Sequence, residues 1–408
     1  MPGFQWLLEQ GAHVERMRSV YPTVTYVCHT SMLTGCWPDR HGVIANEPHL
    51  AGVRKLPWNF YHEAVRCPDI LDACKAAGLT TAAVGWPVTG NHPHVDYLVD
   101  EIWPSGDYSA ETFRQAILES GTPQWLFDRV VAPHLWMRVA RAQPDSSYFS
   151  VAIACDMIRN YRPDALFIHV GNMDHYRHRS GVFGARTDSA AAECEKMLTD
   201  LILATREAGV FADTNFVVTA DHGQMDCART AYPNVLLREN GLIETDEDGN
   251  VTDWQAWCFS CGMSVQIVLK NPEDRDLWNR VYGLLKQYRD MGVWGFSEVW
   301  TAEEVARREH LRGDFSFVLE TDNYTQYGGA WMGAYAVPTA PGLTTNRAGN
   351  HGFHPSKGPR PPFLACGPAF RRGAVLREAS ILDGAPTYAR ILGVDLPDTD
   401  GRVLEDLL

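Results

Sequence analysis

The sequence has no long apolar run, no internal repeat and no low-complexity tract. No stretch reaches the ~18 consecutive apolar residues that a membrane-spanning helix needs, so we expect no membrane span. A secretory signal peptide is not visible either. These absences favour a cytoplasmic protein of the globular type.

Positive charge is also in short supply, with 36 Lys and Arg residues against 50 Asp and Glu residues and a formal charge of −14. A protein that wraps a nucleic-acid polymer needs a basic face, so we expect no nucleic-acid partner. A small anionic substrate remains compatible with this charge, because bound divalent cations dominate the electrostatic field of such a site. The sequence leaves the oligomeric state open.

The ten cysteines are scattered, and most lie in apolar runs, which is typical of reduced, buried thiols. Cys258 and Cys261 form a single Cys-x-x-Cys motif, which without a second pair is a weak signal for a metal or redox site. At 408 residues the chain is long for a single core. We therefore expect one large domain with a smaller inserted unit.

Short apolar runs alternate with helix-like stretches over most of the chain. The runs at 80–84, 165–170 and 215–220 are typical of strands in the middle of a parallel sheet. We therefore expect an α/β fold, a mostly parallel sheet flanked by helices on both faces. The expected helices span about 4–11, 25–33, 69–77, 110–119, 123–141, 146–160, 186–208, 273–288 and 384–392.

The pattern of the sequence changes between residues 227 and 345. A polar hairpin tip at 244–250 and an alternating strand at 264–269 indicate a smaller α+β insert that covers the site. The catalytic domain would then consist of residues 1–226 and 346–408.

Acid–histidine pairs follow two of the expected strands. Asp174 and His178 are four residues apart just after the 165–170 run, and Asp221 and His222 close the 215–220 run. Ligands bind at the carboxyl ends of strands in open parallel sheets, so these groups should lie together, with His351 as a further candidate ligand. Mixed Asp and His ligation favours Zn²⁺, and two such ions suit a hydrolytic centre.

The most specific pattern begins at Pro22-Thr23-Val24-Thr25-Tyr26 and continues through Thr34-Gly35 and Pro38-Asp39-Arg40-His41-Gly42 to Asn46. It resembles the nucleophile region of the nucleotide pyrophosphatase/phosphodiesterase (type I phosphodiesterase) family, within the alkaline phosphatase superfamily. The motifs Asp-x-x-x-His, Asp-His-Gly and Gly-Asn-His-Gly follow in the order of that family. The chain departs from the family pattern at Val27-Cys28, where the family has Pro-Asn, and at Asn172-Met173, where it has Glu-Pro.

The resemblance implies an alkaline-phosphatase-like fold and hydrolysis of a phosphodiester or pyrophosphate bond through a phosphothreonine formed on Thr25. A threonine at a helix start suits that role, because free amides and the helix dipole favour an anion there. By the same resemblance, Asn46 would donate a hydrogen bond to a phosphoryl oxygen. Tyr26 would stack on the base of a nucleotide substrate, although core packing explains Tyr26 equally well.

The resemblance also divides the metal ligands into two sets. Asp221 and His222 would hold one ion together with the oxygen of Thr25. The other ion would be held by Asp174, His178 and His351.

The family supplies one more ligand to the Thr25-side metal, an aspartate that ends a central first strand. Glu9 and Glu15 are the only acidic residues before Thr25 here. We therefore expect that the first strand is missing from this sequence and that the Thr25-side metal is bound weakly. Two other functions stay open. One is a phosphomonoesterase or phosphonate hydrolase of the same superfamily, and the other is a binding protein with impaired catalysis.

Overall fold

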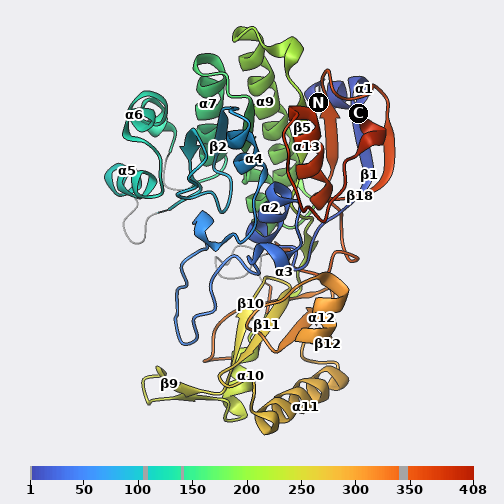
Figure 1. The fold of residues 1–408 in the computed structure, drawn as a ribbon. Coiled ribbons are helices and arrows are strands. Elements are labelled where there is room, and N and C mark those ends of the chain that lie inside the picture. The colour runs from blue at the N-terminus through green and yellow to red at the C-terminus, as the bar shows by residue number, and fades with distance from the viewer. Residues whose placement is uncertain (1, 104–108, 139–141, 340–347) are drawn as a thin grey trace.

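The computed structural model describes residues 2–103, 109–138, 142–339 and 348–408. In Figure 1 a larger part, built from the N-terminal half and the C-terminal segment, lies above a smaller part built from the yellow and orange segment. Within the described ranges, none of the helices has the length and apolar character of a membrane-spanning segment.

The first sheet of the larger part is parallel. It contains β3 (Tyr97–Val99), β2 (Thr81–Val84) and β4 (Ala165–Ile168) in that order. β2 is the central strand and all four of its residues are buried. The expected strands at 80–84 and 165–170 are therefore both present.

The second sheet has the order β18 (Val375–Ser380), β1 (Ala12–Arg18), β17 (Phe363–Cys366) and β5 (Phe216–Thr219). β1 and β18 are parallel, whereas β17 runs antiparallel to both of its neighbours. The α/β class is thus confirmed, and β17 adds an antiparallel strand to a mainly parallel arrangement.

β1 was not expected from the sequence. Its buried side chains are Ala12, Val14 and Met17. Buried and exposed residues do not alternate strictly along the strand, because Glu15 and Arg16 are both exposed. Its pairing with β18 and β17 makes it a strand despite this irregular pattern.

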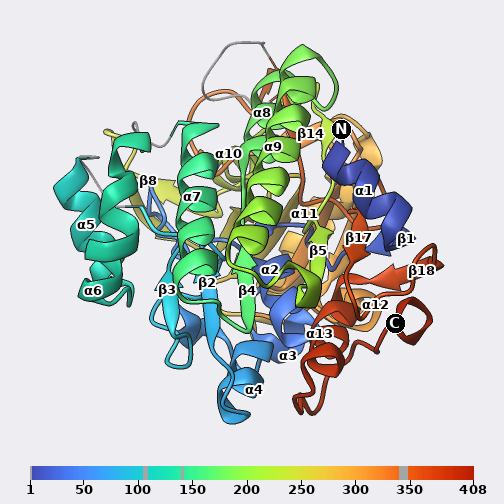
Figure 2. The same ribbon diagram turned by 90° about the horizontal axis from the view of Figure 1, so that it is seen from above.

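β4 and β5 each have an edge without a partner strand among the described residues. Figure 2 shows β3, β2 and β4 on the left of the sheet region and β5, β17 and β18 on the right. All residues of β4 and β5 are only partly buried, although both strands are almost entirely apolar. Such open edges leave backbone groups unpaired, and an additional central strand would pair there.

Helices cover both faces of these sheets (Figure 2). α7 (Asp145–Asn160) packs on β2 and β4 and against α9 (Ala185–Glu207). The other face carries α2 (Thr25–Thr34), α4 (Ile70–Ala76) and α13 (Gly384–Leu392), which pack on one another. These helices agree with the sequence prediction, as do α1 (Pro2–Gln10), α5 (Ala110–Glu119) and α11 (Arg275–Met291).

The single helix predicted at 123–141 is wrong. The chain forms a short helix α6 (Gln124–Leu126), a π-helical turn at Phe127–Val131 and a 3-10 stretch at Ala132–Met137. Pro133 explains the break, because proline has no amide hydrogen and its ring clashes with the preceding helical turn. Residues 139–141 of the predicted helix lie outside the described residues.

The smaller part has its own antiparallel sheet, in the order β10 (Ala256–Ser260), β11 (Ser264–Leu269), β13 (Phe317–Thr321) and β12 (Phe296–Thr301). Its buried core is separate from that beneath the sheets of the larger part. The expected hairpin is formed by β8 (Ile243–Thr245) and β9 (Val251–Trp254). The domain division at 227–345 remains our interpretation, and the end that we predicted for it lies outside the described residues.

Phe363 in β17 is fully buried, paired with Val14 on one side and Thr219 on the other. We predict that Phe363→Ala lowers the free energy of unfolding by about 3–5 kcal/mol, because it leaves a cavity between packed strands. Phe183→Ala is the matched control, since Phe183 is 83% exposed and its loss should change stability by less than ~0.5 kcal/mol. Urea denaturation of the two variants should separate them, and equal midpoints would contradict this account of the core.

Candidate active site

Thr25 is the first residue of α2. The preceding residue, Val24, is extended and has no side-chain oxygen that could cap the helix. The Tyr26 amide donates to Oδ1 of Asn46 at 2.9 Å, which ties the Asn46 side chain to the helix start. The amide end of Asn46 is therefore the end that remains for an anion bound at this helix terminus.

The hydroxyl of Thr25 lies close to the Asp221–His222 pair. Its Oγ1 is 3.5 Å from Nε2 of His222, and that nitrogen is 3.0 Å from Oδ2 of Asp221. Asp221 follows β5 directly, so its position depends on the carboxyl end of that strand. The three side chains named for the Thr25-side metal are thus neighbours.

Asp174, His178 and His351 form the second set, with ligand atoms all within 4.8 Å of one another. α8 (Asn172–Ser180) follows β4 and places Asp174 and His178 on neighbouring turns of one face. Nε2 of His178 is 3.1 Å and Nε2 of His351 is 3.7 Å from Oδ1 of Asp174. The rings of His222 and His351 stack at 3.7 Å, which joins the two sets into one site.

Both histidines of the second set have their Nδ1 atoms bonded to backbone carbonyls. Nδ1 of His178 donates to the Gly349 oxygen at 2.7 Å, and Nδ1 of His351 donates to the Thr23 oxygen at 2.9 Å. A proton on Nδ1 leaves the lone pair on Nε2, which is the atom that faces Asp174. The donor set therefore fits a divalent metal ion.

The Gly-Asn-His-Gly segment reaches the site through a short strand pair. β16 (Gly349–Asn350) pairs with β6 (Met225–Asp226), which follows the Asp221 loop. Gly352 has φ +97°, and a Cβ there would lie 1.6 Å from the Cys261 carbonyl oxygen. Only glycine fits this position, so the final glycine of the motif is needed for His351 to approach the site.

Gln224 is a site residue that the sequence did not reveal. Its Nε2 donates to Oδ1 of Asp174 at 2.8 Å, and its side chain is buried. It lies two residues beyond His222, where no motif or periodicity marks it. The bond fixes the carboxylate that both His178 and His351 approach.

Both carboxylates are held in the ionised form. Burial alone would raise the pKa of Asp174, but without a metal the positive charge of a protonated His178 outweighs burial and holds this pKa well below the usual range. Burial is likewise outweighed at Asp221, where His222 lowers the pKa. Metal ligands must be deprotonated, so both groups are ready for coordination at neutral pH.

His29 is a packed histidine beside the site. It is buried, its Nδ1 bonds the Thr25 oxygen at 2.8 Å, and burial lowers its pKa to about 3. Tyr26 is fully buried, with its ring against Trp58 and Phe60. This placement favours core packing over base stacking for Tyr26.

The two sets of ligands are not equivalent. Among the described residues, Asp174 belongs to a group whose ligand atoms all lie within 4.8 Å of one another, whereas Asp221 and His222 belong to no such group. Nδ1 of His29 lies 3.5 Å from Oδ2 of Asp221, but this nitrogen is bonded to the Thr25 carbonyl oxygen at 2.8 Å. The weaker metal that we expect on the Thr25 side stays a prediction.

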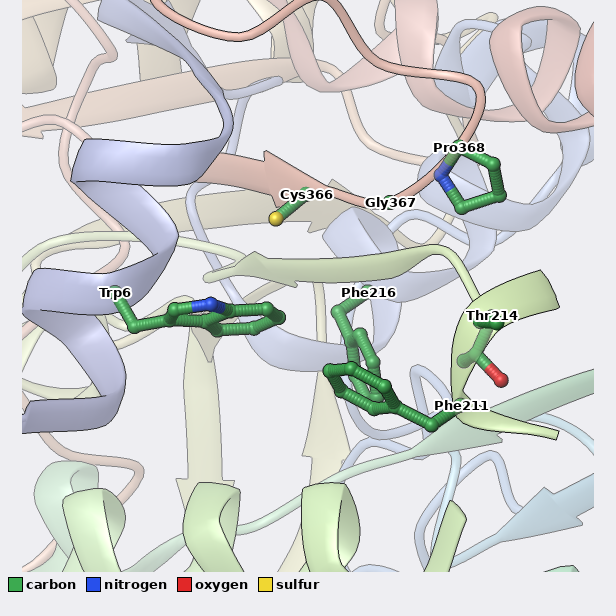
Figure 3. Close-up of a pocket in the computed structure, with 8 residues that line it drawn as sticks. Trp6, Phe211, Thr214, Phe216, Cys366, Gly367 and Pro368 are labelled. Carbon is green, nitrogen blue, oxygen red and sulfur yellow. The ribbon is translucent and has the colours of Figure 1, made fainter. Parts of the chain in front are cut away.

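Two surface pockets lie apart from the metal ligands. Figure 3 shows one of about 230 Å³ between α1, β17 and β5, with Trp6, Phe211 and Phe216 in its walls. It lies at the end of β5 opposite Asp221 and has no acid or imidazole in its lining. The other, of about 400 Å³, is lined by Glu47, which follows Asn46, and by residues of the smaller part such as Trp257.

Residues 1–353 match the sequence model of the type I phosphodiesterase / nucleotide pyrophosphatase family. The chain belongs to this family. The predicted family and the predicted enzyme class, a phosphoric ester hydrolase, are thereby confirmed. The family is metal-dependent, and the Asp174 group is a candidate ligand set for such an ion.

Two relatives show how far the similarity extends. A bis(5'-adenosyl)-triphosphatase of Xenopus laevis is 24% identical over 416 residues, which covers 99% of this chain and 76% of the relative. A venom phosphodiesterase of Macrovipera lebetinus is 24% identical over 239 residues, which covers 57% of this chain and 24% of the relative. The matched part of this chain thus spans about a quarter of the venom enzyme.

Solved structures share the fold. The mouse ectonucleotide pyrophosphatase/phosphodiesterase 5 superposes with a TM-score of 0.68 at 18% identity, covering 100% of this chain and 94% of that chain. An inactive threonine-to-alanine variant of the mouse protein in complex with AMP gives 0.69 at 18% identity, with the same coverage. The human protein gives 0.67 at 20% identity, again with that coverage. The predicted α/β fold is confirmed by these likenesses.

We predict that His351→Ala weakens zinc binding at the Asp174 group by more than about 100-fold, because one of its three protein ligands is lost. Zinc bound per chain, measured after dialysis against a weak chelator, should fall. His354→Ala is the matched control, since His354 bonds Glu309 and Ser356 instead of Asp174. If the two variants keep the same zinc content, His351 is not a ligand.

Proposed function

We propose that this chain hydrolyses a phosphodiester or pyrophosphate bond of a nucleotide through transient phosphorylation of Thr25. The observation that carries the proposal is the position of the Thr25 hydroxyl, in the first residue of α2 and 3.5 Å from Nε2 of His222. Two divalent ions, Zn²⁺ by their Asp and His ligands, complete the proposed site. Asp221, His222 and Thr25 would hold one ion, and Asp174, His178 and His351 the other.

When bound, the ions would supply positive charge that stabilises the oxygens on phosphorus. The other steps of the reaction depend on residues of the chain. The dipole of α2 and the amides at its start, apart from the Tyr26 amide that Asn46 accepts, orient the phosphoryl group above Thr25, and Asn46 donates from its amide nitrogen to a phosphoryl oxygen. The Thr25 hydroxyl loses its proton to solvent, and the Oγ1–phosphorus bond forms as the bond to the leaving group breaks. Water later cleaves the phosphothreonine and restores the hydroxyl.

The names of related proteins support a nucleotide substrate. The Xenopus laevis relative is a bis(5'-adenosyl)-triphosphatase, and the inactive mouse variant was solved with AMP. A threonine-to-alanine change accompanies inactivity in that mouse protein, which supports a threonine nucleophile. Hydrolysis of a diester or pyrophosphate is therefore favoured over hydrolysis of a monoester or phosphonate.

A binding protein with impaired catalysis is the second candidate. It is favoured by the incomplete ligand set around Asp221 and His222. Bis-p-nitrophenyl phosphate, p-nitrophenyl phosphate and p-nitrophenyl phenylphosphonate, assayed with added zinc, separate the candidates. Turnover of the diester alone supports the proposal, turnover of the monoester alone supports a phosphomonoesterase, and no turnover supports the binding protein.

We predict that Thr25→Ala lowers kcat/KM for the diester by at least about 10⁴-fold, since no nucleophile remains. Thr25→Ser should retain measurable turnover, because it keeps a hydroxyl at the same helix start. Zinc content at the Asp174 group should not change in either variant. More than about 1% residual activity in the alanine variant would show that Thr25 is not the nucleophile.

The two catalytic metals should differ in affinity. We predict that the zinc ion lost in Asp221→Asn binds at least about tenfold more weakly than the zinc ion lost in His351→Ala. The reason is that fewer charged and imidazole ligands hold the ion at Asp221. Isothermal titration of the chelated protein and of both variants measures this. Events of equal affinity would mean that a further ligand supports Asp221 and His222.

A further inference from the structure

A second group of imidazoles and carboxylates lies outside the active site. His62, Asp69, Asp72 and His92 each offer a ligand atom, and these atoms lie within 4.8 Å of one another. Over the described ranges, only this group and the Asp174 group have such a geometry. Nothing in the proposed reaction uses these residues.

The start of α4 sets the orientation of the two carboxylates. Asp69 caps the helix, and its Oδ1 accepts from the amides of Leu71 and Asp72. Oδ2 of Asp72 accepts in turn from the Asp69 amide at 3.0 Å. This capping box occupies one oxygen of each carboxylate and leaves Oδ2 of Asp69 and Oδ1 of Asp72 for other partners.

Three histidines approach these two oxygens. The nearest to Oδ1 of Asp72 is Nδ1 of the exposed His94, at 2.6 Å. Nε2 of His92 is 3.1 Å from Oδ2 of Asp69 and 3.9 Å from Oδ1 of Asp72. Nδ1 of His62 is 3.9 Å from Oδ2 of Asp69. The side chains of His92 and Asp69 are 0% and 2% exposed, whereas those of His62 and Asp72 are 16% and 23% exposed. The group is closed on one side and open to solvent on the other.

Helix capping alone does not explain this arrangement. It needs Asp69 and Asp72 but neither His62 nor His92, and it leaves one oxygen of each carboxylate beside these two rings. His62 begins the 3-10 turn His62–Ala64 and His92 lies in the loop between β2 and β3, yet their rings lie 3.8 Å apart. Two imidazoles and two carboxylate oxygens that lie within 4.8 Å of one another match the donor types and the number of ligands of a structural Zn²⁺ site.

We propose that His62, Asp69, Asp72 and His92 bind a third divalent metal ion, Zn²⁺, at a structural site distinct from the catalytic centre. All four positions of the ion would be filled by protein atoms, as in structural zinc sites. The inference does not rest on the proposed reaction and could fail or hold independently of it.

Metal binding at this site requires a change of tautomer at His92. The His94 amide donates to Nδ1 of His92 at 3.1 Å, so the neutral His92 ring carries its proton on Nε2, directed at Asp69. Coordination through Nε2 requires this proton to move to Nδ1, so the His94 amide, in the loop between β2 and β3, must give up its bond.

The proposed ion would join three segments next to the nucleophile helix. The His62 amide donates to the Gly90 oxygen at 2.8 Å, so the two loops already touch. Phe60, two residues before His62, packs against Tyr26 of α2. A metal that fixes His62 to α4 would thus stiffen the wall behind Tyr26.

The test compares zinc content in four proteins: wild type, His62→Gln, His351→Ala and the double variant. We expect His62→Gln to lose about one zinc ion per chain, and the double variant to lose the ions of both sites. His134→Gln is the matched control, since His134 bonds a single carboxylate, Asp156, at 2.7 Å. An unchanged zinc content in His62→Gln would overturn the proposal.

Thermal unfolding with and without zinc chloride provides a readout other than activity. In the His351→Ala background, zinc should still raise Tm, and adding His62→Gln should reduce that rise. A rise of equal size in both backgrounds would overturn the proposal, and so would no rise in either. Diesterase activity should depend on His351 and not on His62, so failure of the metal site and failure of the proposed reaction give different results.

Discussion

The hydrogen bonds to Thr23 are the constraint on which the active site depends. The Thr23 carbonyl accepts from Nδ1 of His351 at 2.9 Å and from the Gly352 amide at 3.0 Å. One backbone group therefore fixes the tautomer of a proposed metal ligand and the position of the loop that carries it. Because Thr23 is two residues before Thr25, the same bonds hold the proposed nucleophile against the metal ligands.

Much of the site could be predicted because its residues follow local rules. The spacing of Asp174 and His178 needs only one helical turn, and Asp221 needs only the end of an apolar strand. Gln224 could not be predicted, since its role depends on a contact across the site with Asp174. β1 was missed for a related reason, because its pairing with β18 outweighs a weak sequence pattern.

The unpaired edges of β4 and β5 lie in the same region of the fold as the two unequal sets of metal ligands. Asp174 and Asp221 follow these two strands, and among the described residues only Asp174 belongs to a compact group of three candidate ligands. A strand paired between β4 and β5 would bury their partly exposed apolar residues and end beside Asp221. Sheet completion and metal affinity on the Thr25 side should therefore change together.

The catalytic group and the group at α4 are built on one principle. In each group, backbone hydrogen bonds occupy one polar atom of a side chain. The other polar atom of that side chain is directed at the point where the proposed ligands meet. Carbonyls do this for His178 and His351, and helix amides do it for Asp69 and Asp72. The difference is that His92 accepts from an amide, whereas the two catalytic histidines donate to carbonyls. In the catalytic site, Nε2 of both histidines therefore faces the ligand group without a proton, whereas His92 of the α4 site must change tautomer before its Nε2 can coordinate.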